Sequence, residues 1–360
     1  MKKAFFLLST LTAFVLLLNS CKQCNKPAND NITVQADTSA NPALNAINAQ
    51  IAKDSTNPFL YYKRAQVYDV MQNYKDAVGS MVLALSLDSV RPEFYLYAAE
   101  LLGKLPEPQR GIALMNRAIS IDSNNVDFYV EAAKLAYIDT TISGNYNLAI
   151  NYLNTAIDKD PQNANIYFNK GMIYKEVGDT AKAISSFQTA TELNPKYYDA
   201  YVQIGLILRT QKDKNAEKYL DNAIKVSDKP EDALYAKANI LKEEGTELYD
   251  GNQPAKAKER MNSAIENFKK VIELNHRNTE AYMGIAFSYY QMDSLQQAYK
   301  YYGLAAEVSP TYAGAYFSKG LCAEEMGKKA EAIALYENCL NIDPTFKRAE
   351  EHLKNLKPAN

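Results

Sequence analysis

The chain has 360 residues, and its 40 Lys and Arg against 42 Asp and Glu give a net charge of −2. No basic stripe breaks this balance, which argues against nucleic acid as a partner. The only two histidines, His276 and His352, cannot share one helix turn and have no Cys pair nearby, so no metal site is expected.

The chain begins with a segment typical of a leader, predicted over residues 1–20. A basic start, Met1-Lys2-Lys3, precedes an almost wholly apolar run over residues 4–18. As a helix this run is roughly 22 Å long, short of the ~30 Å hydrocarbon core, which favours a signal segment over a permanent span.

The end of this segment, Leu18-Asn19-Ser20-Cys21, resembles the lipobox of bacterial lipoproteins. The resemblance implies cleavage after Ser20 and a lipid on Cys21, which would hold the protein on a membrane through its acyl chains. An ordinary secretory signal with a chance Cys is the alternative. Removal of Lys2 and Lys3 with the leader would change the net charge to −4.

In Gram-negative lipoproteins, an Asp directly after the lipid-bearing Cys commonly retains the protein in the inner membrane. This chain has Lys22 at that position, so the resemblance implies the outer membrane. No acidic cluster follows, so we expect the periplasmic face, with the cell surface as the alternative. Residues 21–40 are predicted to be a polar tether with a reach of roughly 25 Å. Residues 41–57 are predicted to contain an N-terminal capping helix.

A pattern of small and aromatic residues then recurs about every 34 residues from 58 to 347. A period of this length indicates stacked helical repeats. Its eight copies begin near residues 58, 92, 126, 164, 198, 231, 279 and 313. The eighth residue is always Ala or Gly, which suits a close helix crossing: Ala65, Ala99, Ala133, Gly171, Gly205, Ala238, Ala286 and Gly320.

The second half of each copy carries a further small residue and a large one. The large residues at position 24 are Met81, Met115, Leu153, Phe187, Leu220, Phe268, Tyr302 and Tyr336. Prolines end several copies, because Pro cannot continue a helix: Pro161, Pro195, Pro310 and Pro344.

These residues resemble the tetratricopeptide repeat family over about 290 residues. The resemblance implies an all-α fold: a right-handed superhelical solenoid of about eight helix–turn–helix units with a concave groove. Residues 348–360 are expected to form a C-terminal capping helix. Such arrays usually present binding surfaces rather than reaction centres.

In the family, the groove is lined mainly by the first helix of each unit. Position 5 is apolar throughout and predicts a groove: Tyr62, Leu96, Val130, Phe168, Val202, Tyr235, Met283 and Phe317. The alternative is that these side chains are half-buried against the next repeat. Lys175, Arg209 and Lys242 at position 12 predict a basic centre, which Glu176 and Glu243 could neutralise.

The sixth copy is 14 residues longer than the others, yet helical periodicity continues through it. Seven residues are close to two helical turns, so the extra length predicts a helical hairpin extended by roughly 10 Å. Leu241 and Leu248 would lie on one side, and Ala257 and Met261 on the other. This hairpin is a candidate docking element; a tolerated surface insertion is the alternative.

The sequence contains no motif typical of a catalytic or cofactor-binding site. No Gly-rich loop follows a strand, and no Ser or Cys stands in a nucleophile elbow, so we expect no enzyme, cofactor or small-molecule substrate. Cys322 and Cys339 are expected to be buried apolar residues or a disulfide. Asp-Ser and Asp-Thr turns resemble glycosylation sites, with helix capping as the preferred explanation: Ser55, Ser89, Thr140, Thr180 and Ser294.

The sequence therefore predicts a non-catalytic scaffold of the bacterial envelope that recruits protein partners at the outer membrane. The alternative is a capture module that holds extended peptides or secreted clients in its groove.

Overall fold

The computed structural model describes residues 41–138 and 145–357, and these residues form helices and connecting turns. The leader, Cys21 and the tether lie outside the described residues. The chain divides into two compact units, residues 1–94 and 95–360, which are described separately below.

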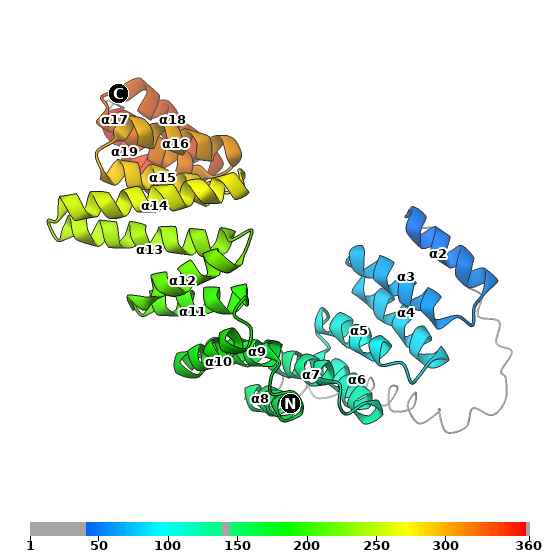
Figure 1. Ribbon diagram of the computed structural model, residues 1–360. Coiled ribbons are helices and arrows are strands. Elements are labelled where there is room, and N and C mark those ends of the chain that lie inside the picture. The colour runs from blue at the N-terminus through cyan, green and yellow to red at the C-terminus, as the bar shows by residue number, and fades with distance from the viewer. Residues whose placement is uncertain (1–40, 139–144, 358–360) are drawn as a thin grey trace, which may run out of the picture. The chain divides into compact units, whose positions relative to one another are not determined.

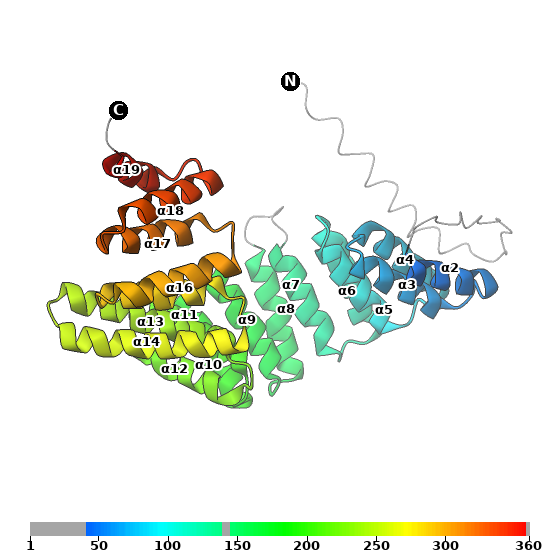
Figure 2. The same ribbon diagram turned by 90° about the horizontal axis from the view of Figure 1, so that it is seen from above.

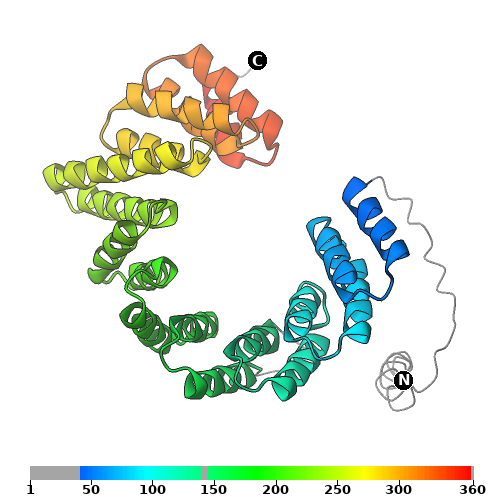
Figure 3. The same ribbon diagram turned by 45° about the vertical axis from the view of Figure 1, so that its right-hand side comes forward.

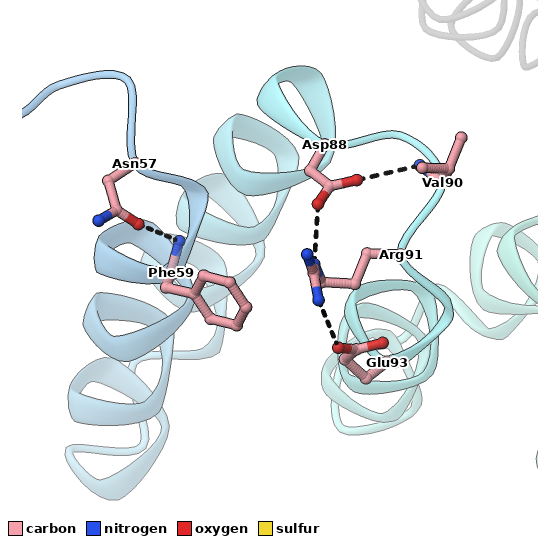
Figure 4. Close-up of polar contacts among 6 residues, drawn as sticks. All are labelled: Asn57, Phe59, Asp88, Val90, Arg91 and Glu93. Carbon is pink, nitrogen blue, oxygen red and sulfur yellow. Dashed lines mark hydrogen bonds and ion pairs between the residues drawn. The ribbon is translucent and has the colours of Figure 1, made fainter.

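The first unit contains α2 (Pro42–Lys53), α3 (Pro58–Val70), α4 (Tyr74–Leu87) and the first residues of α5 (Pro92–Gly103). Arg91 links the end of α4 to the start of α5 (Figure 4). Its guanidinium donates to Asp88 Oδ2 at 2.8 Å and Glu93 Oε1 at 3.1 Å, and lies 4.6 Å from the ring centre of Phe59.

The second unit continues with antiparallel helix pairs, each of which packs on the next (Figure 1, Figure 3). Its helices are α6 (Pro108–Ile121), α7 (Val126–Ile138), α8 (Tyr146–Lys159), α9 (Ala164–Glu176), α10 (Thr180–Leu193), α11 (Tyr198–Thr210), α12 (Asn215–Val226), α13 (Glu231–Asp250), α14 (Pro254–Leu274), α15 (Thr279–Gln291), α16 (Leu295–Val308), α17 (Ala313–Glu325), α18 (Lys329–Ile342) and α19 (Lys347–Leu356).

The predicted fold class, an all-α helical repeat, is confirmed. The first helix of each pair begins at the residue where a sequence copy begins: 58, 92, 126, 164, 198, 231, 279 and 313. Every substantial contact between described helices joins neighbours or next-but-one neighbours. The core is accordingly a series of local clusters rather than one centre.

Position 8 lies directly against position 24 of the same pair. A Cβ added to Gly171 would meet the Phe187 ring at 2.6 Å, and one added to Gly320 would meet the Tyr336 ring at 2.6 Å. Because real Cβ atoms do not approach so closely, the glycines make room for the large side chains.

Asn and Asp, rather than Ser and Thr, cap the helices. At the helix starts, side-chain oxygens accept backbone N–H bonds: Asn41, Asn57, Asn73, Asn163, Asp179 and Asn278. At the ends of second helices, Oδ1 accepts from the N–H two residues on: Asp54, Asp88, Asp122, Asn194, Asn275 and Asp343.

The capping explanation for the Asp-Ser and Asp-Thr turns is right in part, because Asp179 caps α10, which begins at Thr180. Ser55 and Ser89 instead follow corner Asp residues and start no helix. Ser294 precedes α16 without a side-chain cap bond. Thr140 lies outside the described residues.

The sixth pair is lengthened as predicted. Helices α13 and α14 have 20 and 21 residues, seven more than the 13 of α11 and the 14 of α10. Figures 1 and 2 show their joined ends reaching past the neighbouring helices. Seven residues add roughly 10 Å to a helix, so the insertion changes length without rotating the buried face.

None of the helices in the described ranges has the length and apolar character needed to span a bilayer.

Candidate functional site

The candidate site is an aromatic trough on the last three pairs of the second unit. It consists of two adjoining cavities of 360 and 210 Å³ that share Met283, Phe287, Tyr302, Tyr312 and Ser318. The 360 Å³ cavity is also lined by Tyr290, Gly314, Phe317, Leu321, Phe346 and Arg348, and the 210 Å³ cavity by Tyr235, Asn239, Lys242, Glu280 and Gly284.

First helices supply most of this wall. Helix α13 provides Lys242, α15 provides Phe287, α17 provides Phe317, and the capping helix α19 provides Arg348. The spacing of the repeat brings these helices side by side, because α13 contacts α15 and each later pair packs on the one before. The trough is thus a product of stacking, and no single pair contains it.

Aromatic packing shapes the 360 Å³ cavity. The Phe317 ring lies 5.0 Å from Phe346 and 5.8 Å from Tyr336, measured between ring centres. The Arg348 guanidinium lies over the Phe317 ring, 4.8 Å from its centre. Phe317 is only 3% exposed, so it fixes the floor, while Phe287 and Tyr290 are half-buried.

Lys242 marks the other cavity. Its Nζ donates to Asn239 Oδ1 at 2.8 Å and lies 5.8 Å from the centre of the Phe287 ring. Asn239 is held in turn by its own amide, which donates to the Tyr235 carbonyl at 3.0 Å. Burial lowers the pKa of Lys242, because the ammonium has lost part of its water shell.

Tyrosine hydroxyl groups supply hydrogen-bonding positions on the wall of the trough. Burial raises the pKa of Tyr302 above its ordinary value, and burial followed by nearby Glu280 raises that of Tyr312. The Tyr290 hydroxyl donates to Glu325. These groups are therefore neutral donors and acceptors at physiological pH, suited to hydrogen bonding rather than proton transfer.

The position-5 residues are not a uniform groove. Val130, Val202 and Phe317 are 4, 6 and 3% exposed, so they pack mainly between helices, and of the three only Phe317 lines the trough. The other five are half-buried: Tyr62, Leu96, Phe168, Tyr235 and Met283. The trough brings together only Tyr235, Met283 and Phe317.

The three position-12 cations each have a different partner. Lys175 Nζ donates to Gln203 Oε1 at 2.9 Å. Arg209 forms a two-point ion pair with Glu243, so that Glu243 neutralises Arg209. Lys242 is held only by a neutral amide, and it alone of the three lines the trough.

The hairpin residues expected to dock a partner mostly hold the hairpin together. Leu241, Ala257 and Met261 are at most 2% exposed, and Met261 packs against Gly245 between α13 and α14. These three side chains stabilise the hairpin from within, Leu248 is half-buried, and docking of a partner by the hairpin stays a prediction. Leu248 lines a charged cleft of 790 Å³ with Glu217, Glu244 and Arg260, and Arg260 forms an ion pair with each of the two glutamates.

Both described cysteines are free and buried. Cys322 packs with Tyr302 in one cluster and Cys339 with Tyr336 in another, so the disulfide alternative is wrong for this structure. Burial raises the pKa of the Cys322 thiol to about 12 and that of Cys339 to about 11. Within the described part of the chain, no group of His, Cys, Asp and Glu is arranged to hold a metal ion.

Sequence reasoning missed several trough residues. Arg348 was hidden because α19 is outside the repeat pattern, and Tyr302 because position 24 is normally core. Tyr312 precedes its helix, and Phe287 stands at position 9 of its copy, whereas the groove prediction used positions 5 and 12. One feature of the sequence could have indicated the trough, because aromatic residues become frequent between residues 282 and 317.

Comparisons with known proteins find tetratricopeptide repeats in this chain. A family model described as Tetratricopeptide repeat matches residues 164–197 and 313–346, and one described as TPR repeat matches residues 141–178. No curated protein shows significant sequence similarity to the chain.

One solved structure of those compared shares the fold with a TM-score above 0.5. The C-terminal part of a TPR repeat-containing protein from Cytophaga hutchinsonii is 21% identical, with a TM-score of 0.55 over 72% of this chain and 99% of that one. A tetratricopeptide repeat protein from Parabacteroides merdae is 17% identical, with a TM-score of 0.45 over 74% and 98%. YrrB, described as a TPR protein with an unusual peptide-binding site, is 19% identical, with a TM-score of 0.45 over 56% and 97%.

Proposed function

We propose that this chain is a non-catalytic scaffold that recruits partner proteins at the bacterial outer membrane, in envelope assembly, secretion or cell-wall machinery. The observation that carries the recruiting role is the aromatic trough. Its half-buried rings, such as Phe287 and Tyr290, line an opening that the side chains of the described residues do not fill.

The membrane part of this proposal depends on the leader and on Cys21, which lie outside the described residues. A lipid on Cys21 would anchor the protein, and Lys22 favours the outer membrane. The lack of an acidic cluster after Cys21 favours the periplasmic side over the cell surface. The polar tether over residues 22–40 would then separate the repeats from the bilayer.

A second candidate is capture of extended peptides or secreted clients. The same trough favours it, because rows of aromatic side chains with hydroxyl groups suit an extended chain with little structure of its own. The two candidates differ in their partners: a scaffold holds folded proteins in fixed ratio, whereas a capture protein holds many unfolded segments.

Crosslinking in intact cells followed by mass spectrometry tests the proposal. We expect a small set of envelope proteins in constant ratio, and loss of part of that set in Phe287→Ala. The matched control is Tyr146→Ala, which removes an exposed ring on α8 far along the stack. A broad and variable set of secreted chains would favour the capture function, and no specific crosslinks at all would contradict both.

A further inference from the structure

We propose, on the premise of the recruiting function above, that the aromatic trough binds an extended segment of a partner protein through an acidic side chain and a bulky apolar side chain. The carboxylate would pair with Lys242, and the apolar side chain would enter the 360 Å³ cavity. Lys242 would thus be the residue that determines specificity.

The case for a carboxylate starts from how Lys242 is held. Its ammonium is partly desolvated and has one neutral hydrogen-bond partner, Asn239 Oδ1, at 2.8 Å. Among the residues that the structure describes, it forms no ion pair. A cation that has already lost water and keeps free N–H donors gains more from an incoming carboxylate than a fully hydrated one does.

The nearest carboxylates do not satisfy Lys242. Glu243 is taken by the two-point pair with Arg209. Glu280 interacts electrostatically with both Lys242 and Tyr312, but it forms no ion pair with Lys242 and is exposed at the edge of the cavity. Other cations nearby are paired, as Lys212 is with Glu247 and Lys237 with Asp221. Lys242 therefore differs from its neighbours in lacking an internal counter-ion.

The apolar half of the ligand follows from the adjoining cavity. Its volume of 360 Å³ is at the lower end of ligand-binding sites, and Met283, Phe287 and Phe346 line it. Phe287 borders both cavities, so a carboxylate on Lys242 and an apolar side chain in the larger cavity would belong to one short segment.

A second cation argues for a segment that continues in both directions. Arg348 is exposed, stacks on Phe317, and has no carboxylate partner among the described residues. Cations therefore stand on both cavities of the trough. This arrangement complements a chain with acidic side chains on both sides of its apolar anchor, and it favours side-chain carboxylates over a chain terminus.

Phage display of random 12-residue peptides on the detergent-solubilised full chain supplies the probe. We expect enrichment of Asp or Glu within a few residues of a large apolar side chain. A selected peptide is then measured against Lys242→Met and Lys242→Arg. The matched control is Lys258→Met, which removes the same charge from an exposed position on α14.

Lys242→Met should weaken binding at least about tenfold, Lys242→Arg should restore part of it, and Lys258→Met should change it less than about twofold. Exchanging the peptide's Glu for Gln should weaken binding to the native chain but add little in Lys242→Met, as a double-mutant cycle requires. Circular dichroism verifies that each variant is folded.

Two outcomes would overturn the inference: selection of peptides without acidic residues, or independent effects of the two substitutions in the cycle. Neither would remove the recruiting function, because crosslinked partners in cells would remain unchanged in Lys242→Met. If the native chain itself formed no specific crosslinks in cells, the recruiting function would be contradicted.

Discussion

Single side chains decide how closely the helices of a pair approach, and Gly320 offers a test. Gly320→Ala would bring a Cβ to 2.6 Å from the Tyr336 ring. Since this ring is fully buried and held by neighbours, we expect a loss of about 1–3 kcal/mol in the free energy of unfolding, measured by denaturant titration.

Gly303→Ala is the control in the adjacent helix. There the new methyl group meets only the flexible end of Lys319, at 3.2 Å. Removing a mid-helix glycine should then stabilise the protein by about 0.5–1 kcal/mol. Equal losses in both variants would show that the close approach to Tyr336 has no special role.

Acid stability provides a second test at the residue scale. The Tyr299 hydroxyl donates to Glu331, and this bond lowers the pKa of Glu331 below its ordinary value of 4.5. A lowered pKa in the folded state contributes stability above about pH 4.5, and that contribution is lost as the pH falls through the lowered pKa.

Tyr299→Phe should therefore flatten the loss of thermal stability between about pH 6 and about pH 3. The change should stay below about 1 kcal/mol, because the carboxylate is partly exposed and screened by solvent. Tyr301→Phe, in the same helix without a carboxylate bond, should retain the native pH profile. Identical profiles in the two variants would contradict the role of the Tyr299–Glu331 bond.

Residue patterns predicted the small and large positions of each pair. Close packing restricts the side-chain volume at positions 8 and 24 of every copy, as at Gly171 and Phe187. The patterns could not predict the trough. Whether Val202 or Phe287 faces an opening depends on the angle between successive pairs, which small-residue spacing does not specify. The burial of Val130 and Val202 follows from that angle.

At the scale of elements, the lengthened pair should be removable. Deleting residues 244–250 and 254–260 leaves helices of 13 and 14 residues joined by the three-residue turn 251–253, the lengths of α11 and α10. Two turns leave each helix, so the buried faces stay in register.

We expect this shortened protein to fold with a modestly lower thermal midpoint, since it loses the burial of Met261 and the exposed pairs of Arg260. Circular dichroism during heating measures both properties. Deleting residues 244–250 alone should disrupt the pair, and equal behaviour of the two deletions would refute the register argument.

The capping helix α19 protects the last pair. It buries Ala349 against the cluster that contains Cys339, whereas Cys322 packs in a different cluster with Ala286 and Ala298. Ending the chain at Phe346 should therefore expose Cys339 and leave Cys322 covered.

In a background carrying Cys21→Ser and Cys24→Ser, the thiols of the complete chain should react slowly at about pH 8, since burial has raised their pKa values to about 12 and about 11. Truncation should speed modification of Cys339 at least about tenfold, read by mass spectrometry. Equal acceleration at Cys322 would indicate general unfolding rather than loss of a cap.

At the scale of the whole molecule, the proposed anchor is directly testable. Cys21→Ser should abolish labelling by radioactive palmitate and move the protein out of the outer-membrane fraction, because acyl chains supply most of the membrane affinity. Cys24→Ser is the control and should remain lipidated and bound. Membrane retention of the Cys21→Ser chain would contradict lipid anchoring at this residue.

The repeat period predicted the architecture well because it acts at a fixed spacing in eight copies, so single departures do not hide it. The lengths of α13 and α14 were predictable from the helical periodicity that continues through the 14 added residues of the sixth copy. Partner identity is not encoded in this way, since it depends on a few residues such as Lys242 and Arg348 that the period does not constrain.

Among the described helices, substantial contacts reach no further than the next-but-one neighbour, and this short range also determines how such a protein loses its structure. A broken or oxidised helix deprives only its immediate neighbours of support, so harm has a short range and distant pairs keep their structure. A cell would then inherit fragments that still bind rather than a wholly inactive chain, and turnover would depend on proteases that recognise frayed ends.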